Sequence, residues 1–175
     1  MLSGTPLKHF PKSVLSYYDL LKHPIDALPR TLKDMGYATH ALHPNYSSYW
    51  NRHTVYPQMG IDYFHQVTSF VKPDDYSTPW HVSDQRLMEV ATRLLRDDQD
   101  SFLFIATIAN HGPWNFEPKK PFPVPADLLD DKVRDSLRDY IGRAIDADEA
   151  IAWLTRYLAK RKKPTLVVVF GDHMP

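Results

Sequence analysis

The stretch LVVVFGDH, residues 166–173, is an apolar run of mostly β-branched side chains that ends in glycine, aspartate and histidine. A run of this length predicts a strand buried on both faces, as in a parallel sheet covered by helices. Gly171 allows a sharp turn, so Asp172 and His173 should follow the carboxyl end of the strand. A carboxylate beside an imidazole suits a divalent metal ion. The same pair also suits a helix cap and a surface histidine.

Two more strands are predicted upstream of this one. Tyr37–Leu42 form a short strand that ends at His43, and Ser101–Ala109 form a nearly continuous apolar strand that runs into Asn110 and His111. Helical periodicity precedes each strand, at residues 24–36, 83–95 and about 128–160. This alternation predicts an α/β fold with a mainly parallel central sheet flanked by helices.

The composition excludes several classes of partner and site. The 21 basic and 21 acidic residues cancel, so no overall positive field attracts nucleic acid or an anionic membrane surface. Cysteine is absent, which excludes disulfides, thiolate ligands and cysteine nucleophiles and leaves His, Asp and Glu as metal ligands. No apolar run approaches the ~20 residues that span a bilayer, and the N-terminus lacks the pattern of a signal peptide.

Three polar clusters follow the three predicted strands: residues 43–52, 110–111 and 172–173. Because the carboxyl ends of parallel strands meet at one edge of a sheet, we expect the clusters to converge there. Each residue taken singly also has a structural explanation. His43 and His111 suit a strand end and a turn, Arg52 suits a solvated surface position, and Trp50 and Trp114 suit a core.

The last predicted helix carries an acidic residue among apolar ones. Asp148 shares a helical stripe with Leu137, Ile141, Ala144, Ile151 and Leu158. A carboxylate on a buried stripe needs a partner, so we expect Asp148 to have a structural role and to pair with a buried donor.

Residues 43–52, HPNYSSYWNR, followed by GIDYF at 60–64, resemble the substrate-binding stretch of lipoteichoic acid synthases and related phosphoglycerol transferases. These enzymes belong to the sulfatase-like branch of the alkaline phosphatase superfamily. Residues 107–114, TIANHGPW, resemble the strand of this family that ends in Asn-His, and residues 170–173, FGDH, resemble its Gly-Asp-His metal motif. The motifs occur in the family's order, and the similarity extends from about residue 28 to the last residue.

The resemblance implies a role for each matching residue. Asp172 and His173 would be ligands of the catalytic divalent ion, usually Mn²⁺ or Mg²⁺, with Zn²⁺ as an alternative. His111 would be catalytic. The residues that would surround the phosphate and glycerol of the substrate are His43, Asn45, Trp50 and Arg52. Arginine can hold phosphoryl oxygens with a forked pair of donors, and imidazole can donate to an oxyanion or protonate a leaving alkoxide.

Two departures from the family pattern limit what the resemblance implies. Asn45 stands where the Gram-positive synthases often have aspartate. An amide brings no charge, so the resemblance does not establish that the substrate has the same lipid headgroup. The family's threonine nucleophile and a further acidic ligand lie upstream of the matched region, and Thr5 does not replace the nucleophile. We therefore expect residues 1–175 to be a single partial catalytic domain that is inactive alone, with residues 1–23 as an irregular lead-in.

The implied parent protein is a metal-dependent enzyme, anchored in the membrane and active at its extracytoplasmic face. It would move a phosphoglycerol group from a phospholipid donor to a glycan or polymer acceptor, in two steps. The alternatives within the superfamily are a sulfatase, a phosphoethanolamine transferase and a phosphodiesterase. A further alternative is a non-catalytic domain that binds a lipid headgroup or a glycan.

Overall fold

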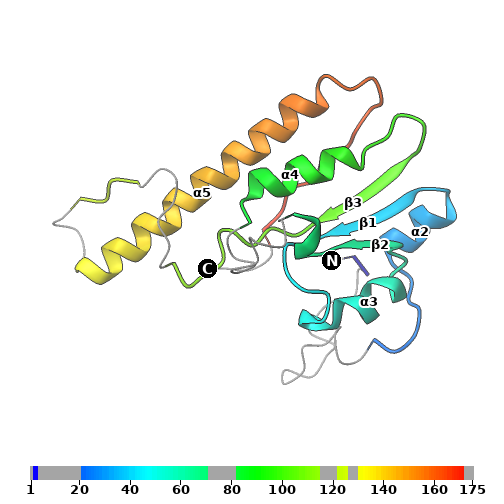
Figure 1. The fold of residues 1–175 in the computed structure, drawn as a ribbon, viewed down its shortest axis with the longest axis horizontal. Coiled ribbons are helices and arrows are strands. Elements are labelled where there is room, and N and C mark those ends of the chain that lie inside the picture. Colours follow the sequence, from blue (N-terminus) through cyan, green and yellow to red (C-terminus); the bar gives the residue numbers. More distant parts are fainter. Residues whose placement is uncertain (1, 4–20, 71–81, 115–121, 126–129, 172–175) are drawn as a thin grey trace.

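The computed structural model describes residues 2–3, 21–70, 82–114, 122–125 and 130–171 (Figure 1). Three strands, β1 (Ala38–Leu42), β2 (Tyr63–His65) and β3 (Ser101–Ile105), form a parallel sheet in the order β2-β1-β3. The helices are α2 (Leu28–Asp34), α3 (Arg52–Gln58), α4 (Asp84–Arg93) and α5 (Asp131–Leu158), with short 3₁₀ turns η2 (Tyr49–Asn51) and η3 (Val67–Ser69).

Apolar side chains cover both faces of the central strand β1. On one face, Ala41 belongs to a buried cluster with Val55 of α3. On the other face, Leu42 packs in a second cluster with Leu87 of α4. In Figure 1, α4 lies between the sheet and α5, and α3 lies on the opposite side of the sheet. The predicted parallel sheet flanked by helices is thus confirmed.

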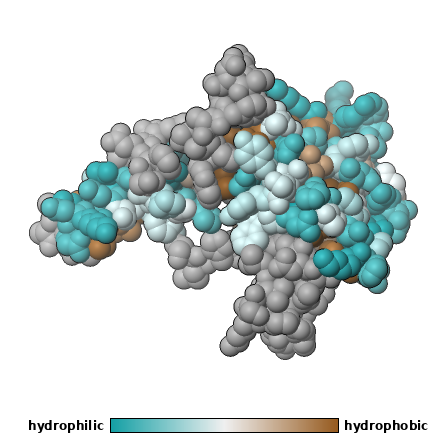
Figure 2. All heavy atoms as spheres, turned by 60° about the horizontal axis from the view of Figure 1, so that its bottom comes forward, coloured by the Kyte–Doolittle hydropathy of each residue, from teal (hydrophilic) through white to brown (hydrophobic). Residues whose placement is uncertain are grey.

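Hydrophilic side chains predominate at the two ends of the face shown in Figure 2, and apolar ones gather near its middle. In the described part of the chain, no helix combines the length and the hydropathy that crossing a bilayer requires.

The two longest helices begin with the capping residues that helix physics favours. Ser83 accepts a hydrogen bond from the Arg86 amide at 3.2 Å and is the N-cap of α4. The buried residues of α5 are Asp139, Gly142, Ala150 and Leu154, and Asp148 is exposed. The predicted buried role of Asp148 is therefore wrong, whereas the apolar residues of the stripe are partly buried and Leu158 packs against the cluster between α4 and α5. The reason is that α5 packs against Met88 of α4, which selects the line of residues through Ala150 and Leu154.

Residues 164–171 do not form the strand that their composition predicts. No strand is found there in the described structure, and Leu166 is 89% and Phe170 47% exposed. Asp172 and His173 lie outside the described residues. A strand requires hydrogen bonds to a neighbour as well as apolar side chains, and none of the three described strands pairs with this segment. The strand β3 pairs with β1 among the described strands, and its residues are half-buried. It ends at Ile105, where its pairing with β1 ends, and not at Ala109 as predicted.

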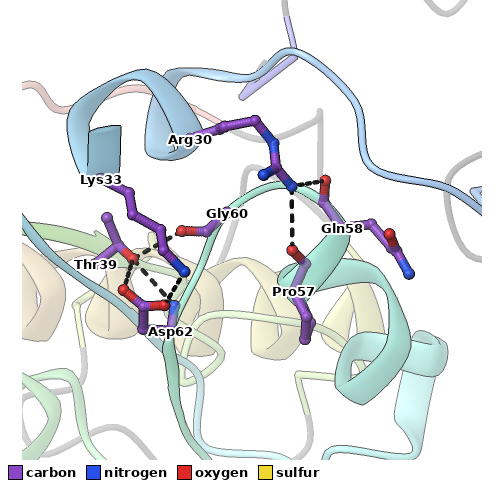
Figure 3. Close-up of polar contacts among 7 residues, drawn as sticks. All are labelled: Arg30, Lys33, Thr39, Pro57, Gln58, Gly60 and Asp62. Carbon is purple, nitrogen blue, oxygen red and sulfur yellow. Dashed lines mark hydrogen bonds and ion pairs between the residues drawn. The ribbon is translucent and has the colours of Figure 1, made fainter. Parts of the chain in front are cut away.

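A polar network fixes the chain between α3 and β2 (Figure 3). The Arg30 guanidinium of α2 donates to the Gln58 carbonyl at 2.9 Å. The Thr39 hydroxyl of β1 donates to the Gly60 carbonyl at 2.8 Å and accepts from the Asp62 amide at 3.0 Å. These bonds align β2 beside β1 and so set where the loops that follow both strands begin.

We expect Gly60→Ala to destabilise the fold strongly. Gly60 has a φ of 89°, and a Cβ there would lie 2.5 Å from the Arg30 Cα. Left-handed strain and the backbone clash together predict a loss of about 2–5 kcal/mol in the free energy of unfolding, measured by urea denaturation. Gly36→Ala is the matched control, because Gly36 has a φ of 92° with nothing within 4 Å of its Cβ position. Equal losses at the two glycines would contradict this account.

Candidate functional site at the carboxyl edge of the sheet

His43 lies where the carboxyl ends of the three strands meet. It follows β1 directly and is 5% exposed. Its amide donates to the carbonyl of His65, the last residue of β2, at 3.0 Å, and its Nδ1 lies 2.9 Å from the carbonyl oxygen of Ala106, which follows β3. A carbonyl only accepts, so Nδ1 carries the proton and Nε2 is the basic nitrogen of the neutral ring. The structure confirms that His43 lies at the carboxyl edge.

Asn45 shapes the loop that follows β1. Its side-chain Oδ1 accepts from the Tyr46 amide at 2.7 Å, and its carbonyl accepts from the Val67 amide at 3.2 Å. Asn45 is buried, and these bonds tie it to the next residue and to the segment after β2. Because Oδ1 is used within the loop, a contact with substrate would come from the side-chain NH₂ group.

The backbone is strained just before α3. Trp50 has a φ of 57° and Asn51 a φ of 49°, so two successive residues other than glycine are left-handed. Each costs on the order of 1–3 kcal/mol, and such strain is concentrated at functional sites. The Trp50 ring stands edge-on to Tyr49, with ring centroids 5.5 Å apart. Asparagine is enriched in this conformation but tryptophan is not, so the sequence does not predict two successive left-handed residues here.

Arg52 is a buried cation. It is the first residue of α3 and is 7% exposed, so the alternative of a solvated surface charge is wrong. Its Nη1 donates to the Tyr49 carbonyl at 3.1 Å, and the guanidinium carbon lies 5.6 Å from the centre of the Tyr49 ring. Among the described residues, Nε has no hydrogen-bond partner and no carboxylate pairs with the side chain. A buried guanidinium with a free donor is suited to an anionic ligand.

His111 lies beyond the end of β3 and is exposed. Its amide donates to the Ile108 carbonyl at 2.9 Å, and its Nδ1 lies 2.7 Å from the Gly112 carbonyl oxygen. Nearby, the indole N–H of Trp114 donates to the Asn110 carbonyl at 3.2 Å. Trp114 is half-buried rather than a core residue. The segment that carries His111 therefore starts beside His43, at Ala106, and ends in a turn at the surface.

A histidine pair that the sequence analysis did not single out joins β1 and β2. The His40 Nδ1 lies 3.1 Å from the His65 Nε2. Burial lowers the pKa of both imidazoles, and in His40 the neighbouring His65 lowers it further. The two rings therefore favour the neutral form and share a hydrogen bond on one face of the sheet.

The predicted metal ligands cannot be placed, because Asp172 and His173 lie outside the described residues. Within the described ranges, no group of three or more His, Asp or Glu side chains could hold a metal ion. The chemistry of the predicted pair, a hard carboxylate with an imidazole, fits Mn²⁺, Mg²⁺ or Zn²⁺. The metal therefore remains a proposal.

The fold and this edge define an α/β protein with a buried arginine and histidine beyond the carboxyl ends of parallel strands. The chain belongs to the sulfatase family, whose family model matches residues 1–175. This confirms the resemblance to sulfatase-like enzymes.

Three similar proteins illustrate the relationship. A Rhizobium meliloti protein named for cyclic β-1,2-glucan modification is 29% identical over 177 residues, covering 99% of this chain and 27% of that protein. The lipoteichoic acid synthase LtaP from Listeria monocytogenes is 26% identical, with a TM-score of 0.67 over 82% of this chain and 34% of its own. The Streptococcus pyogenes phosphoglycerol transferase GacH, solved with sn-glycerol-1-phosphate, is 19% identical, with a TM-score of 0.69 over 93% of this chain and 43% of its own. This chain therefore spans less than half of each relative.

Proposed function

We propose that the parent protein transfers a phosphoglycerol-type group from a lipid donor to a glycan or polymer of the cell envelope. The observation that carries the proposal is the buried Arg52 guanidinium, which has no carboxylate partner among the described residues. Membership of the sulfatase family, and similarity to a protein named lipoteichoic acid synthase, support an enzyme that acts on phosphate esters.

In this proposal, Arg52 and His43 hold different parts of the substrate. The Arg52 fork donates to two phosphoryl oxygens, which spreads the charge of the anion over a planar cation. His43 donates through Nδ1 to Ala106, so its Nε2 accepts from a glycerol hydroxyl. Trp50 and the NH₂ group of Asn45 complete the surroundings of the headgroup.

The chemistry is a transfer in two steps. First, a hydroxyl nucleophile bonds to phosphorus and the bond from phosphorus to the diacylglycerol oxygen breaks. The attacking hydroxyl loses a proton, and His111 supplies one to the leaving oxygen. In the second step, an acceptor hydroxyl gives its proton to His111 and bonds to phosphorus, while the bond from phosphorus to the nucleophile's oxygen breaks and that oxygen takes up a proton from solvent. We assign the nucleophile to no residue of this chain.

A divalent ion bound by Asp172 and His173 would supply Lewis-acid polarisation of the phosphoryl group. Manganese or magnesium is the proposed occupant, with zinc as an alternative. We place the active parent protein at the extracytoplasmic face of the membrane, because lipid donors and envelope acceptors meet there. The 175 residues alone are proposed to be inactive.

The test is turnover of a fluorescent phosphatidylglycerol by the full-length product of the gene, with Mn²⁺ and with a chelator. We expect release of diacylglycerol that the chelator abolishes. Parallel assays use a phosphatidylethanolamine and an aryl sulfate. Turnover of either one in place of phosphatidylglycerol would overturn the substrate class, and binding of the headgroup without any turnover would favour a binding domain.

A further inference from the structure

Both polar groups of the Ala109 backbone are held by helices. The backbone amide of Ala109 interacts with the carboxylate of Asp84, the first residue of α4, and lowers its pKa. The Ala109 carbonyl accepts a hydrogen bond from Nη1 of Arg143 on α5. Two helices therefore hold one residue, which lies two positions before His111.

Burial of the Asp84 carboxylate destabilises the fold. It is 4% exposed, and its Oδ1 has no hydrogen-bond partner among the described residues. Burial raises the pKa of the carboxyl to about 6, the Ala109 amide lowers it, and Asp146 raises it. Ser83 already caps α4, so the cap does not explain a buried acid beside it.

We propose that Asp84 and Arg143 are positioning residues for His111, because together they fix the backbone from which that exposed imidazole projects. The inference rests on the proposed function of His111. Side-chain packing holds an exposed ring poorly, so its position depends on the backbone that precedes it. The Arg143 hydrogen bond, together with the Asp84 carboxylate beside the Ala109 amide, supplies a fixed backbone two residues upstream.

The hold on Ala109 should depend on pH. Asp146 of α5 is the charged group that acts on Asp84, Arg143 of the same helix binds the Ala109 carbonyl, and His111 is the titratable residue that follows in the held segment. An ionised carboxylate accepts a hydrogen bond more strongly than a protonated one, so the Ala109 amide is held more firmly above about pH 6 than below it.

The stability of the whole fold should change in the opposite direction. The folded-state pKa of Asp84 lies above its usual value of 3.8. The proton that Asp84 binds more tightly in the folded state therefore stabilises the fold fully below pH 3.8. This stabilisation is lost as the pH rises through about 6. If Asp84 had only a structural role, amide protection near Ala109 would not increase with pH while the stability of the whole fold decreases.

The experiment measures amide hydrogen exchange of the full-length protein at pH 5 and pH 7.5, corrected for the intrinsic rate, in the peptide that covers residues 106–111. We expect wild-type protection to be greater at pH 7.5. Asp84→Asn, which keeps an acceptor oxygen, should remove this difference. Arg143→Met should lower protection about tenfold at both pH values, and Arg143→Lys, which can still donate, should restore most of it.

Two controls match these variants. Asp131→Asn removes a first-turn acid of α5 that is 87% exposed, and Arg156→Met removes an exposed arginine of the same helix. Neither control should change protection at residues 106–111. Unchanged protection in Asp84→Asn and Arg143→Met would overturn the proposal.

A second arm measures turnover of the donor lipid. Asp84→Asn and Arg143→Met should lower kcat about tenfold with little change in KM, and Asp84→Asn should flatten the pH profile near pH 6. Altered protection with unchanged kcat would overturn the positioning role. A wild-type protein that does not act on the lipid would overturn the proposed function instead, while the exchange arm still tests the hold on Ala109.

Discussion

Replacement of Arg52 by methionine should lower turnover of the donor lipid about 10²- to 10³-fold, because the charged donors to the phosphoryl oxygens are lost. The free energy of unfolding should stay the same or rise. The wild-type fold buries this cation with no carboxylate beside it among the described residues, and methionine removes that cost while filling similar space. Steady-state turnover and urea denaturation of the full-length protein measure the two effects.

Two further variants separate geometry from charge. Arg52→Lys keeps the positive charge and loses the planar fork, so turnover should remain at least about tenfold below wild type. Arg96→Met is the control, because Arg96 is exposed and pairs with Asp98 at the surface. If Arg52→Met lost several kcal/mol of stability but kept its activity, Arg52 would be a structural residue and the phosphate site would lie elsewhere.

The second large effect is expected at His43, where two substitutions test the two ring nitrogens separately. In His43→Asn, the side-chain NH₂ group takes the place of Nδ1 and can still donate to Ala106. The basic Nε2 is lost, so turnover should fall about 10²- to 10⁴-fold with the fold intact.

His43→Gln makes the opposite change. Its amide reaches the place of Nε2 and leaves the Ala106 carbonyl without this donor, which predicts a loss of about 1–3 kcal/mol in stability. Unfolding curves should therefore show the larger loss of stability in His43→Gln, and turnover assays should show the larger loss of activity in His43→Asn. Similar stability and similar activity in both would show that His43 only joins β1 to the end of β3.

Local patterns in the sequence were sufficient to predict the strands β1 and β3 and the helices α2, α4 and α5. The strand before His43 and the helix that begins at residue 83 follow from the pattern of apolar residues, and the structure confirms both. Residues 164–170 show the limit of such patterns. Their composition indicates a buried strand, but burial depends on a partner strand that composition cannot identify.

The site was predicted in part for the same reason. The carboxyl-edge rule placed His43 correctly, because it depends only on strand direction. The buried state of Arg52 and the left-handed conformation of Trp50 depend on how the loop packs, and neither residue type gives a local signal for it. The hold of Asp84 and Arg143 on Ala109 joins residues far apart in the chain, so only the fold reveals it.

The central claim is that Arg52 and His43 form a site for a glycerol phosphate group. A crystal structure of the full-length protein with glycerol phosphate tests it most directly. The account predicts a phosphoryl oxygen about 3 Å from the Arg52 Nε and a glycerol hydroxyl about 3 Å from the His43 Nε2. A ligand bound elsewhere, with Arg52 paired to a carboxylate of its own protein, would contradict it.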